Sequence, residues 1–268
     1  MNSNWARKTM KTGVVAAGAV LVAGSAGVAN AGGSHGAVDT HDQVGALNGN
    51  QVVAPVQAPV NICGIAASVL GTAGASCEGG AEAEMNGPGS GDVTTYDNTG
   101  LGNGNQAVAP VQAPVDVSGI AAGVAGGATA GSEGGSDATL EESGRAEESA
   151  TTTGNDGALS GNQLLAPVQA PVNACGNAVA VFGGAAAGCE GGAEAEMDGM
   201  GGSDLTTTDN DGIGNGNQAY IPVQAPVNVC GNAIAIFGTA YASCEGGSEA
   251  DIDEPHEENT KGHLSGKK

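Results

Sequence analysis

The sequence is poor in the large side chains that fill an ordinary protein core. It contains two Phe, three Tyr and a single Trp, whereas Gly occupies 49 of the 268 positions. Too few large apolar groups are present to offset the conformational entropy lost on ordering one large domain. The composition therefore predicts small folded units separated by disordered segments.

Basic residues are also scarce. The chain has seven Lys and Arg against 29 Asp and Glu, which gives a formal net charge of −22. Nucleic-acid phosphates require cationic partners, so no nucleic-acid partner is expected. The acidic excess favours a soluble chain that is repelled by anionic surfaces, although cations bound at clustered carboxylates would reduce the repulsion.

The first 31 residues have the features of a secretory signal peptide. Arg7, Lys8 and Lys11 precede an apolar run over residues 14–22, and a small-residue cleavage site ends at Ala31. The run is shorter than the ~20 residues that cross a bilayer, and no second apolar span follows, so no transmembrane segment is expected. We therefore predict export and cleavage after residue 31, which leaves four basic and 29 acidic residues and a formal charge of −25.

One ten-residue string occurs four times. The string QVVAPVQAPV at residues 51–60 recurs in similar form from residues 106, 163 and 218. A longer period of 112 residues relates copies 1 and 3 and copies 2 and 4. Repeats of this kind are single structural units. The sequence predicts four modules, which are listed here with their bounds: 43–80, 98–135, 155–192 and 210–247.

Charged residues are concentrated between the modules. The stretches 48–77, 160–189 and 215–244 contain none, and the stretch 103–132 contains only Asp116. The spacers at 133–156 and 193–209 and the acidic tail at 248–268 lack an evident apolar period, which is typical of solvated linkers. The predicted fold class is mainly β, with four small disulfide-closed β modules joined by acidic, Gly/Ser-rich disordered linkers.

Inside a module the apolar residues alternate with polar ones. In copy 4 the apolar residues at 221, 223, 225, 227 and 229 alternate with Pro, Gln and Asn, which predicts a first β-strand. Its two prolines favour an edge position or partly polyproline structure. A second strand is predicted at 66–70, 178–182 and 233–237 as its partner, with a turn at residues 71–74 or 183–184. A short helix over 65–76 is the alternative.

The six cysteines occur as three pairs with identical spacing. The members of each pair are fourteen residues apart in an exported chain, which predicts intramodule disulfides, listed here: Cys63 with Cys77, Cys175 with Cys189, and Cys230 with Cys244. Module 2 has Ser118 and Ser132 at the equivalent positions. Each bridge removes roughly 3 kcal/mol of unfolded-state entropy, so module 2 is predicted to be the least stable.

The sequence offers no constellation for catalysis or for a cofactor. The cysteines are committed to disulfides, and no His lies in a module, so we predict no enzyme activity, no catalytic residue, no metal site and no cofactor. Zinc is disfavoured because its usual Cys and His spacings are absent. The string Asp209-Asn210-Asp211-Gly212 is similar to the start of a calcium loop but lacks the later acid, which favours turn chemistry.

The repeated string resembles a known family. Gly-Asn-Gln-x-x-x-Pro-Val-Gln-Ala-Pro-Val-Asn-x-Cys-Gly-Asn, ended by a second Cys, is similar to the chaplin module of filamentous actinobacteria, and copy 4 matches it best. The resemblance implies a secreted protein of the cell surface or cell wall that assembles into amyloid-like fibrils and makes aerial hyphae and spores water-repellent. The chain differs in having four modules and in ending without a sorting motif or an apolar tail. Covalent anchoring is therefore not expected.

Two functions compete at this level. The first is a structural surface protein that self-assembles, alone or with other chaplin-like proteins, into an amyloid-like coat and adheres to surfaces; charge-free segments with high β propensity favour it, whereas prolines and acidic spacers restrain aggregation. The second is a multivalent protein whose four tethered modules bind cell-wall polymer or other chaplin-like chains with avidity.

Overall fold

The computed structural model describes residues 38–86, 92–141, 150–198 and 205–253, and all regular structure in them is β-strand. Each described segment forms one layer of eight strands. The predicted signal peptide at 1–31 and residues 254–268 of the predicted tail lie outside the described residues.

The strands of the four layers have nearly identical lengths. Layer 1 contains β1 (Val38–His41), β2 (Val44–Ala46), β3 (Gln51–Val53), β4 (Val56–Gln57), β5 (Val60–Ile62), β6 (Ile65–Ser68), β7 (Thr72–Glu78) and β8 (Ala81–Asn86). Layer 2 contains β9 (Val93–Tyr96), β10 (Thr99–Leu101), β11 (Gln106–Val108), β12 (Val111–Gln112), β13 (Val115–Ser118), β14 (Ile120–Val124), β15 (Gly127–Glu133) and β16 (Ser136–Glu141). Layer 3 contains β17 (Ala150–Thr153), β18 (Asp156–Ala158), β19 (Gln163–Leu165), β20 (Val168–Gln169), β21 (Val172–Cys175), β22 (Ala178–Val181), β23 (Gly184–Glu190) and β24 (Ala193–Asp198). Layer 4 contains β25 (Leu205–Thr208), β26 (Asp211–Ile213), β27 (Gln218–Tyr220), β28 (Val223–Gln224), β29 (Val227–Cys230), β30 (Ala233–Ile236), β31 (Thr239–Glu245) and β32 (Ser248–Asp253).

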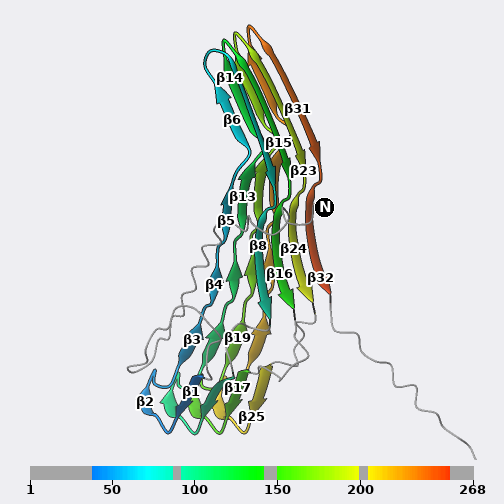
Figure 1. Cartoon of the computed structure of the whole chain (residues 1–268). Helices are drawn as coiled ribbons and strands as arrows, with labels where there is room; N and C mark the ends of the chain where they lie inside the picture. The colour runs from blue at the N-terminus through cyan, green and yellow to red at the C-terminus, as the bar shows by residue number, and fades with distance from the viewer. Residues whose placement is uncertain (1–37, 87–91, 142–149, 199–204, 254–268) are drawn as a thin grey trace, which may run out of the picture.

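Strands pair between layers. Each of the eight sheets contains one strand from every layer in the order 1, 2, 3, 4, and all pairs are parallel and in register, so that Asp116 of β13 lies between Asn61 and Asn173. The prediction that the first strand pairs with the second strand of its own module is wrong. Similar copies in register place most apolar and amide side chains beside their own kind, which favours pairing between copies. Figure 1 shows the resulting curved stack.

Within a layer the chain folds back twice, near β2 and between β6 and β7, so that two arms face each other and β1 lies opposite β3 (Figure 1). In layer 1 the first arm runs through β3 to β6 and the second through β7 and β8. The second predicted strand is confirmed as a strand rather than a helix at β6, β22 and β30. The reversal comes slightly earlier than predicted in layer 1, because Thr72 already begins β7. In layer 3 it passes through Phe182, at φ 56°, and Gly183.

The space between the arms holds two apolar clusters. Near the reversal the cluster consists of alanines only, among them Ala121, Ala178 and Ala180, none of which is exposed. At the other end Val53, Leu140 and Met197 belong to a cluster of larger side chains. This cluster also contains residues of β9, β17 and β25, the strands equivalent to β1 in layers 2 to 4. A core can therefore form with few aromatic residues, because small side chains fill the narrow space between the arms and the same contacts repeat along the stack.

The prolines interrupt the strands without ending the sheet. The Pro55 carbonyl accepts a 2.8 Å hydrogen bond from the Val111 amide, and the Pro110 carbonyl accepts one of 2.8 Å from Val168. Proline lacks only the donor, so the first arm is divided into short strands that keep one register. The predicted edge position is wrong for layers 2 and 3, whose proline-bearing arms have a neighbouring layer on both sides, whereas the partly polyproline alternative stays a prediction.

The prediction of solvated linkers is also wrong for much of the spacers. Strands β16 and β17 lie in spacer 133–156, β24 and β25 lie in spacer 193–209, and β32 lies in the predicted tail. In β24 the small or apolar Ala193, Ala195 and Met197 are buried and alternate with acidic residues. This period of two makes a strand with one acidic face. The four copies thus form one stack. Whether the predicted module bounds delimit units that fold separately stays a prediction.

Candidate functional site

The outward face of the first arm is apolar. In β5 and β6 Val60, Ile62 and Ile65 are 45%, 64% and 48% exposed, and in layer 4 Val227 and Val229 are 46% and 48% exposed. Large contiguous apolar surfaces of this kind mark sites of interaction. We call this surface, formed by the outward residues of β3 to β6 and their equivalents in layers 2 to 4, the apolar face.

Most inward positions of β3 to β5 and their equivalents carry amides or prolines, although Val53, Val108 and Leu165 also face inward. Gln51, Gln112 and Gln169 are buried, and so are the inward prolines such as Pro59. The usual pattern of a sheet with one wet face, apolar inward and polar outward, is thus largely reversed over β3 to β5 and their equivalents. The alternation was visible in the sequence, but nothing in it indicated which half faces solvent.

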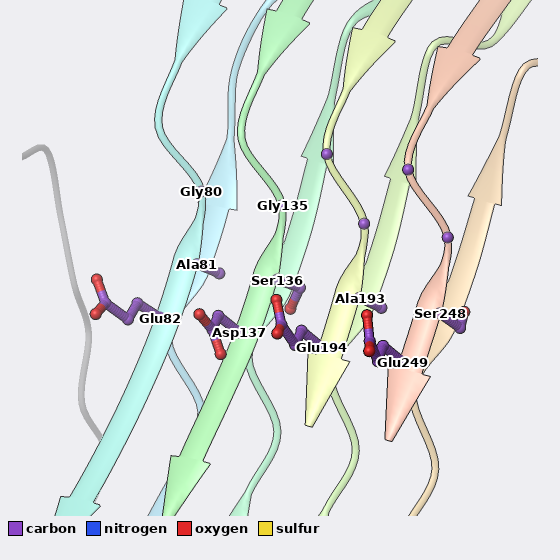
Figure 2. Close-up of a pocket in the computed structure, with 14 residues that line it drawn as sticks. Gly80, Ala81, Glu82, Gly135, Ser136, Asp137, Ala193, Glu194, Ser248 and Glu249 are labelled. Atoms are coloured by element: carbon purple, nitrogen blue, oxygen red, sulfur yellow. The ribbon is translucent and has the colours of Figure 1, made fainter. Parts of the chain in front are cut away.

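The outward face of the second arm is acidic. Glu82, Asp137, Glu194 and Glu249 are in-register neighbours in β8, β16, β24 and β32. Figure 2 shows these four side chains in one row across the strands. They border a groove whose floor includes four glycine positions, Gly80, Gly135, Gly192 and Gly247. A second row, Glu78, Glu133, Glu190 and Glu245, runs beside it along β7 and its equivalents.

These rows lack basic partners within the described part of the chain. The four described segments contain neither Lys nor Arg, and their one recorded ion pair joins His41 to the neighbouring Asp42. Burial raises the pKa of Glu196, and the nearby carboxylates of Asp198, Glu194, Asp137 and Asp251 raise it further. The stack therefore has one apolar and one strongly anionic outer face.

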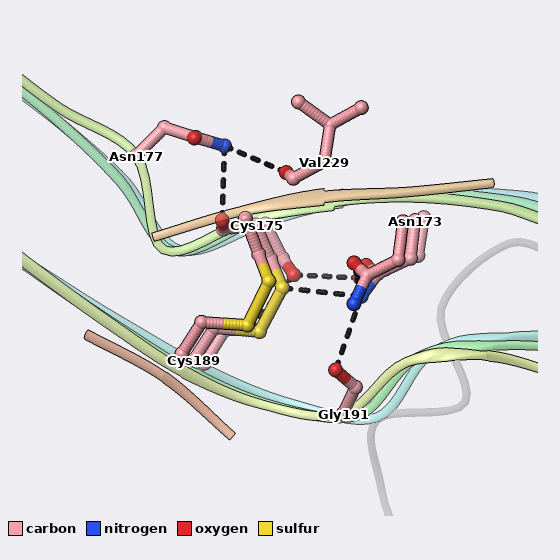
Figure 3. The surroundings of a disulfide bond; sticks show 12 residues. Asn173, Cys175, Asn177, Cys189, Gly191 and Val229 are labelled. Atoms are coloured by element: carbon pink, nitrogen blue, oxygen red, sulfur yellow. Dashed lines mark hydrogen bonds between the residues drawn. A yellow bond between two sulfur atoms is a disulfide. The ribbon is translucent and has the colours of Figure 1, made fainter. Parts of the chain in front are cut away.

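The three disulfides join the two arms near the alanine cluster. The structure links Cys63 to Cys77, Cys175 to Cys189 and Cys230 to Cys244, the pairs that the spacing predicts, with Cα–Cα distances of 5.7 to 5.8 Å. Two amide side chains border the middle bridge (Figure 3). Asn173 Nδ2 donates to Cys175 Sγ at 3.1 Å, and Asn177 Nδ2 donates to the Cys175 carbonyl at 2.9 Å.

Layer 2 replaces the bridge by hydrogen bonds. The hydroxyl oxygens of Ser118 and Ser132 lie 2.8 Å apart across the arms, and Ser118 donates to Asp116 Oδ2 at 2.6 Å. Asp116 is fully buried. Burial raises the pKa of Asp116, and the hydrogen bonds from Ser118 and Asn61 oppose that rise. The lower stability predicted for module 2 stays a prediction. Layer 2 lies inside the stack and is paired with layers 1 and 3, so its stability includes their contacts.

Columns of amide side chains run along the stack between the arms. Gln163 Nε2 donates to Gln106 Oε1 at 3.0 Å, and Gln218 Nε2 donates to Gln163 Oε1 at 3.2 Å. Asn50, Asn105, Asn162 and Asn217 form a second such column. Ladders of this type stabilise in-register cross-β structures because every amide finds a partner in the next layer.

The string that is similar to a calcium loop belongs to the bend at one end of each layer. Asp209 has φ 51°, and Asn210 Oδ1 accepts a 2.9 Å hydrogen bond from the Asn155 amide. Gly212, at φ 130°, lies so close to the Gly157 carbonyl that a Cβ would overlap it. Each of these residues has a structural role in the turn, as the turn interpretation predicts.

Neither a metal site nor a membrane-spanning helix occurs among the residues that the structure describes. Within them, no cluster of three or more His, Cys, Asp or Glu residues has the arrangement of a metal site. None of the described residues belongs to a helix with the length and apolar character of a membrane span.

The two end layers leave their outer edges unpaired. In layer 3, every second residue of β24 is buried, whereas every residue of its layer 4 equivalent β32 is exposed. At the other end β5 is more exposed than β13 in layer 2. Layers 1 and 4 thus present a backbone edge and the ends of all side-chain columns.

Comparison with known proteins identifies similar sequences. The ChpA-C family model matches residues 26–83, 139–193 and 190–248, segments that contain all six cysteines. Three relatives come from Streptomyces coelicolor. Chaplin-A is 33% identical over 132 residues, 38% of this chain and 51% of the relative. Chaplin-C is 35% identical over 124 residues, 35% of this chain and 48% of the relative.

Chaplin-B is 32% identical over 124 residues, which is 38% of this chain and 52% of the relative. The chain thus spans about half the length of the curated relatives that it matches. No solved structure matches the chain.

Proposed function

Because this chain belongs to the chaplin (ChpA-C) family, we propose that it is a secreted structural protein that self-assembles into an amyloid-like, water-repellent coat at the cell surface. The observation that carries the proposal is the pair of opposite outer faces. One is built from Val and Ile side chains and the other from rows of carboxylates. A stack of this kind lowers its free energy by placing the apolar face against air or lipid and the acidic face in water.

The in-register stacking supports the assembly part of the proposal. Parallel strands with stacked Gln and Asn columns are the arrangement found in amyloid-like fibrils. The disulfides of layers 1 and 4 hold the arms of these end layers together, so that their backbone edges stay extended. The coat, the adhesion to surfaces and the attachment at the cell wall belong to the same proposal, which requires no enzyme activity, cofactor or metal.

Surface tension measured on purified, oxidised protein tests the proposal. We expect the parent chain to lower surface tension and its films to bind thioflavin T. The double variant I62E/V229E places charges on the apolar face at positions 64% and 48% exposed, where folding is little affected, and should lose most surface activity. The matched control E82Q/E249Q changes two residues of the acidic face and should retain it. Equal activity of I62E/V229E and the parent would contradict the proposal.

The alternative function, avidity through four tethered modules, has less support. Tethered modules gain affinity because each binds independently on a flexible linker. The four copies instead share every sheet of one stack, so they cannot reorient separately. A cell-wall polymer could still bind along the stack. If I62E/V229E binds purified wall material as well as the parent does but has lost surface activity, wall binding does not depend on the apolar face.

A further inference from the structure

We infer that the partner of the layer 4 edge is layer 1 of a second copy of this chain, so that copies add head to tail and continue the same in-register stack. This inference deepens the proposed self-assembly and rests on it. It commits to one polarity and to one set of neighbouring residues, which the family assignment does not supply.

The first argument is the distribution of backbone donors and acceptors on the two edges. Inside the stack the amides of Val223 and Val227 donate to the carbonyls of Pro167 and Pro171, each at 2.9 Å. By the same geometry the carbonyls of Pro222 and Pro226 point out of layer 4, and proline has no N–H beside them. This edge is therefore rich in acceptors.

Layer 1 presents the complementary groups. The amide of Val111 in layer 2 donates toward layer 1, and that of Val115 does the same. Their layer 1 equivalents, Val56 and Val60, therefore direct N–H groups away from the stack. Layer 1 of a second copy could donate from Val56 and Val60 to Pro222 and Pro226. Two layer 4 edges placed together would instead oppose proline to proline.

The amide columns have the same polarity. The Asn217 backbone amide donates to Asn162 Oδ1 at 2.9 Å, so Asn217 Oδ1 is the next acceptor in its column and Asn50 of a second copy carries the next donor. The neighbouring column runs in the opposite sense, because the Ser160 amide donates to Asn215 Oδ1 at 2.7 Å. Head-to-tail addition satisfies both columns, whereas head-to-head addition would oppose two donors at Asn50.

The two-layer period of the sequence also continues across such a junction. Layers 1 and 3 are related by the 112-residue period, as are layers 2 and 4. Placing layer 1 of a second copy on layer 4 is thus equivalent to the junction between layers 2 and 3 that already exists. Gln218 would lie beside Gln51 and Asn228 beside Asn61, so each of these columns would continue with its own residue type.

Carboxylates would regulate this junction. Glu245 would lie beside Glu78 and Glu249 beside Glu82 of the second copy, at the interlayer spacing of about 4.8 Å. Like charges at this distance repel in low salt, and salt or protonation reduces the repulsion. Addition should therefore be slow at neutral pH in low salt and faster in high salt or acid.

Cysteine cross-linking tests the polarity. Thr72 and Thr239 occupy the same column, at exposed ends of layers 1 and 4. Within one chain three interlayer steps, about 14 Å, separate them, which is too far for a disulfide. We would prepare T72C and T239C as separate chains, confirm the native bridges by mass mapping, mix the chains under assembly conditions and oxidise them. Head-to-tail addition predicts a covalent T72C–T239C dimer on non-reducing gels and little dimer from either chain alone.

The matched control is V44C mixed with T239C. Val44 is an exposed residue of layer 1 that belongs to a different column, so this mixture should not cross-link. Assembly with thioflavin binding but without the mixed dimer would overturn the head-to-tail inference and leave the proposed function intact. Dimers from T239C alone would overturn it in favour of the opposite polarity. A chain that neither assembles nor lowers surface tension would overturn both.

Discussion

Asn61 Nδ2 donates a 2.5 Å hydrogen bond to Asp116 Oδ1 across the junction of layers 1 and 2. Asn occupies this column in layers 1, 3 and 4, so Asp116 is a buried carboxylate in a column of amides. Its neighbour in layer 3, Asn173, has a buried Oδ1 that finds no hydrogen-bond donor among the described residues. A carboxylate cannot supply that donor, whereas an amide or a protonated acid can.

The first prediction concerns Asp116→Asn. The new amide extends the column, and we expect the free energy of unfolding at pH 7 to rise by about 1–3 kcal/mol. The pKa of Asp116 is raised in the folded chain, so the folded state keeps this proton to higher pH than the unfolded state. In the parent, the contribution of Asp116 to the free energy of unfolding should be most favourable below about pH 4. It should be lost as the pH rises through the pKa of Asp116 in the folded chain.

Urea unfolding at pH 4 and pH 7 measures both effects. D116N should reduce the loss of stability between the two pH values, whereas Asp39→Asn, a change at an exposed residue of β1, should leave it in place. A lower unfolding midpoint for D116N at pH 7 would show that the carboxylate is favourable in this column.

The second prediction is that layer 2 accepts a fourth disulfide. Ser118 and Ser132 occupy the cysteine positions, with their hydroxyls 2.8 Å apart. The triple variant D116N/S118C/S132C reproduces the Asn173, Cys175 and Cys189 arrangement of layer 3 and should gain up to ~3 kcal/mol over D116N when oxidised. Mass mapping and urea unfolding with and without reductant measure the bridge and the gain. An oxidised variant no more stable than its reduced form would contradict the prediction.

The sequence predicted the β class, the second strand and the bridges because these depend on local pattern. Residues 233–236 alternate Ala with the β-branched Ile, which favours a strand, and the spacing of fourteen residues between Cys230 and Cys244 recurs in two other copies. The family resemblance was likewise carried by an ordered string of residues. Each of these features can be read within one copy.

Pairing between copies could not be read in this way. A period of two is the same whether a strand pairs with its own module or with the next one, and only the in-register stack decides. The acidic spacers misled for a related reason: in β8 Glu82 and Glu84 dominate the composition, although Ala81 and Ala83 are the residues that pack inward. Gln51 is polar yet buried, because the hydrogen bonds of the amide column satisfy its side chain between the arms.

The third prediction concerns the close approach of the arms. Ala180 is fully buried and packs in the alanine cluster, near a bridge whose Cα atoms are 5.8 Å apart. Leu does not fit there, so Ala180→Leu should destabilise the chain by about 1–3 kcal/mol or more. Ala122→Val is the matched control because Ala122 faces outward between Ala67 and Val179. Urea unfolding that shows equal effects for the two variants would contradict the close packing.

The fourth prediction concerns the carboxylates of β24. Burial, followed by repulsion from Asp198 and Glu194, raises the pKa of Glu196, so its ionised form is disfavoured in the fold and its contribution to stability falls as the pH rises through this raised pKa. Glu196→Gln should therefore raise the unfolding midpoint at pH 7 in low salt.

Layer 2 has Thr139 at this position, so a neutral side chain fits the column. The gain from E196Q should shrink in 1 M salt, where the Debye length is about 3 Å, and should be absent at pH 4, where the carboxylate is already largely protonated. Unfolding curves at two salt concentrations and two pH values measure these differences. A gain that persists unchanged in high salt would mean that packing of the amide, rather than relief of charge repulsion, stabilises the variant.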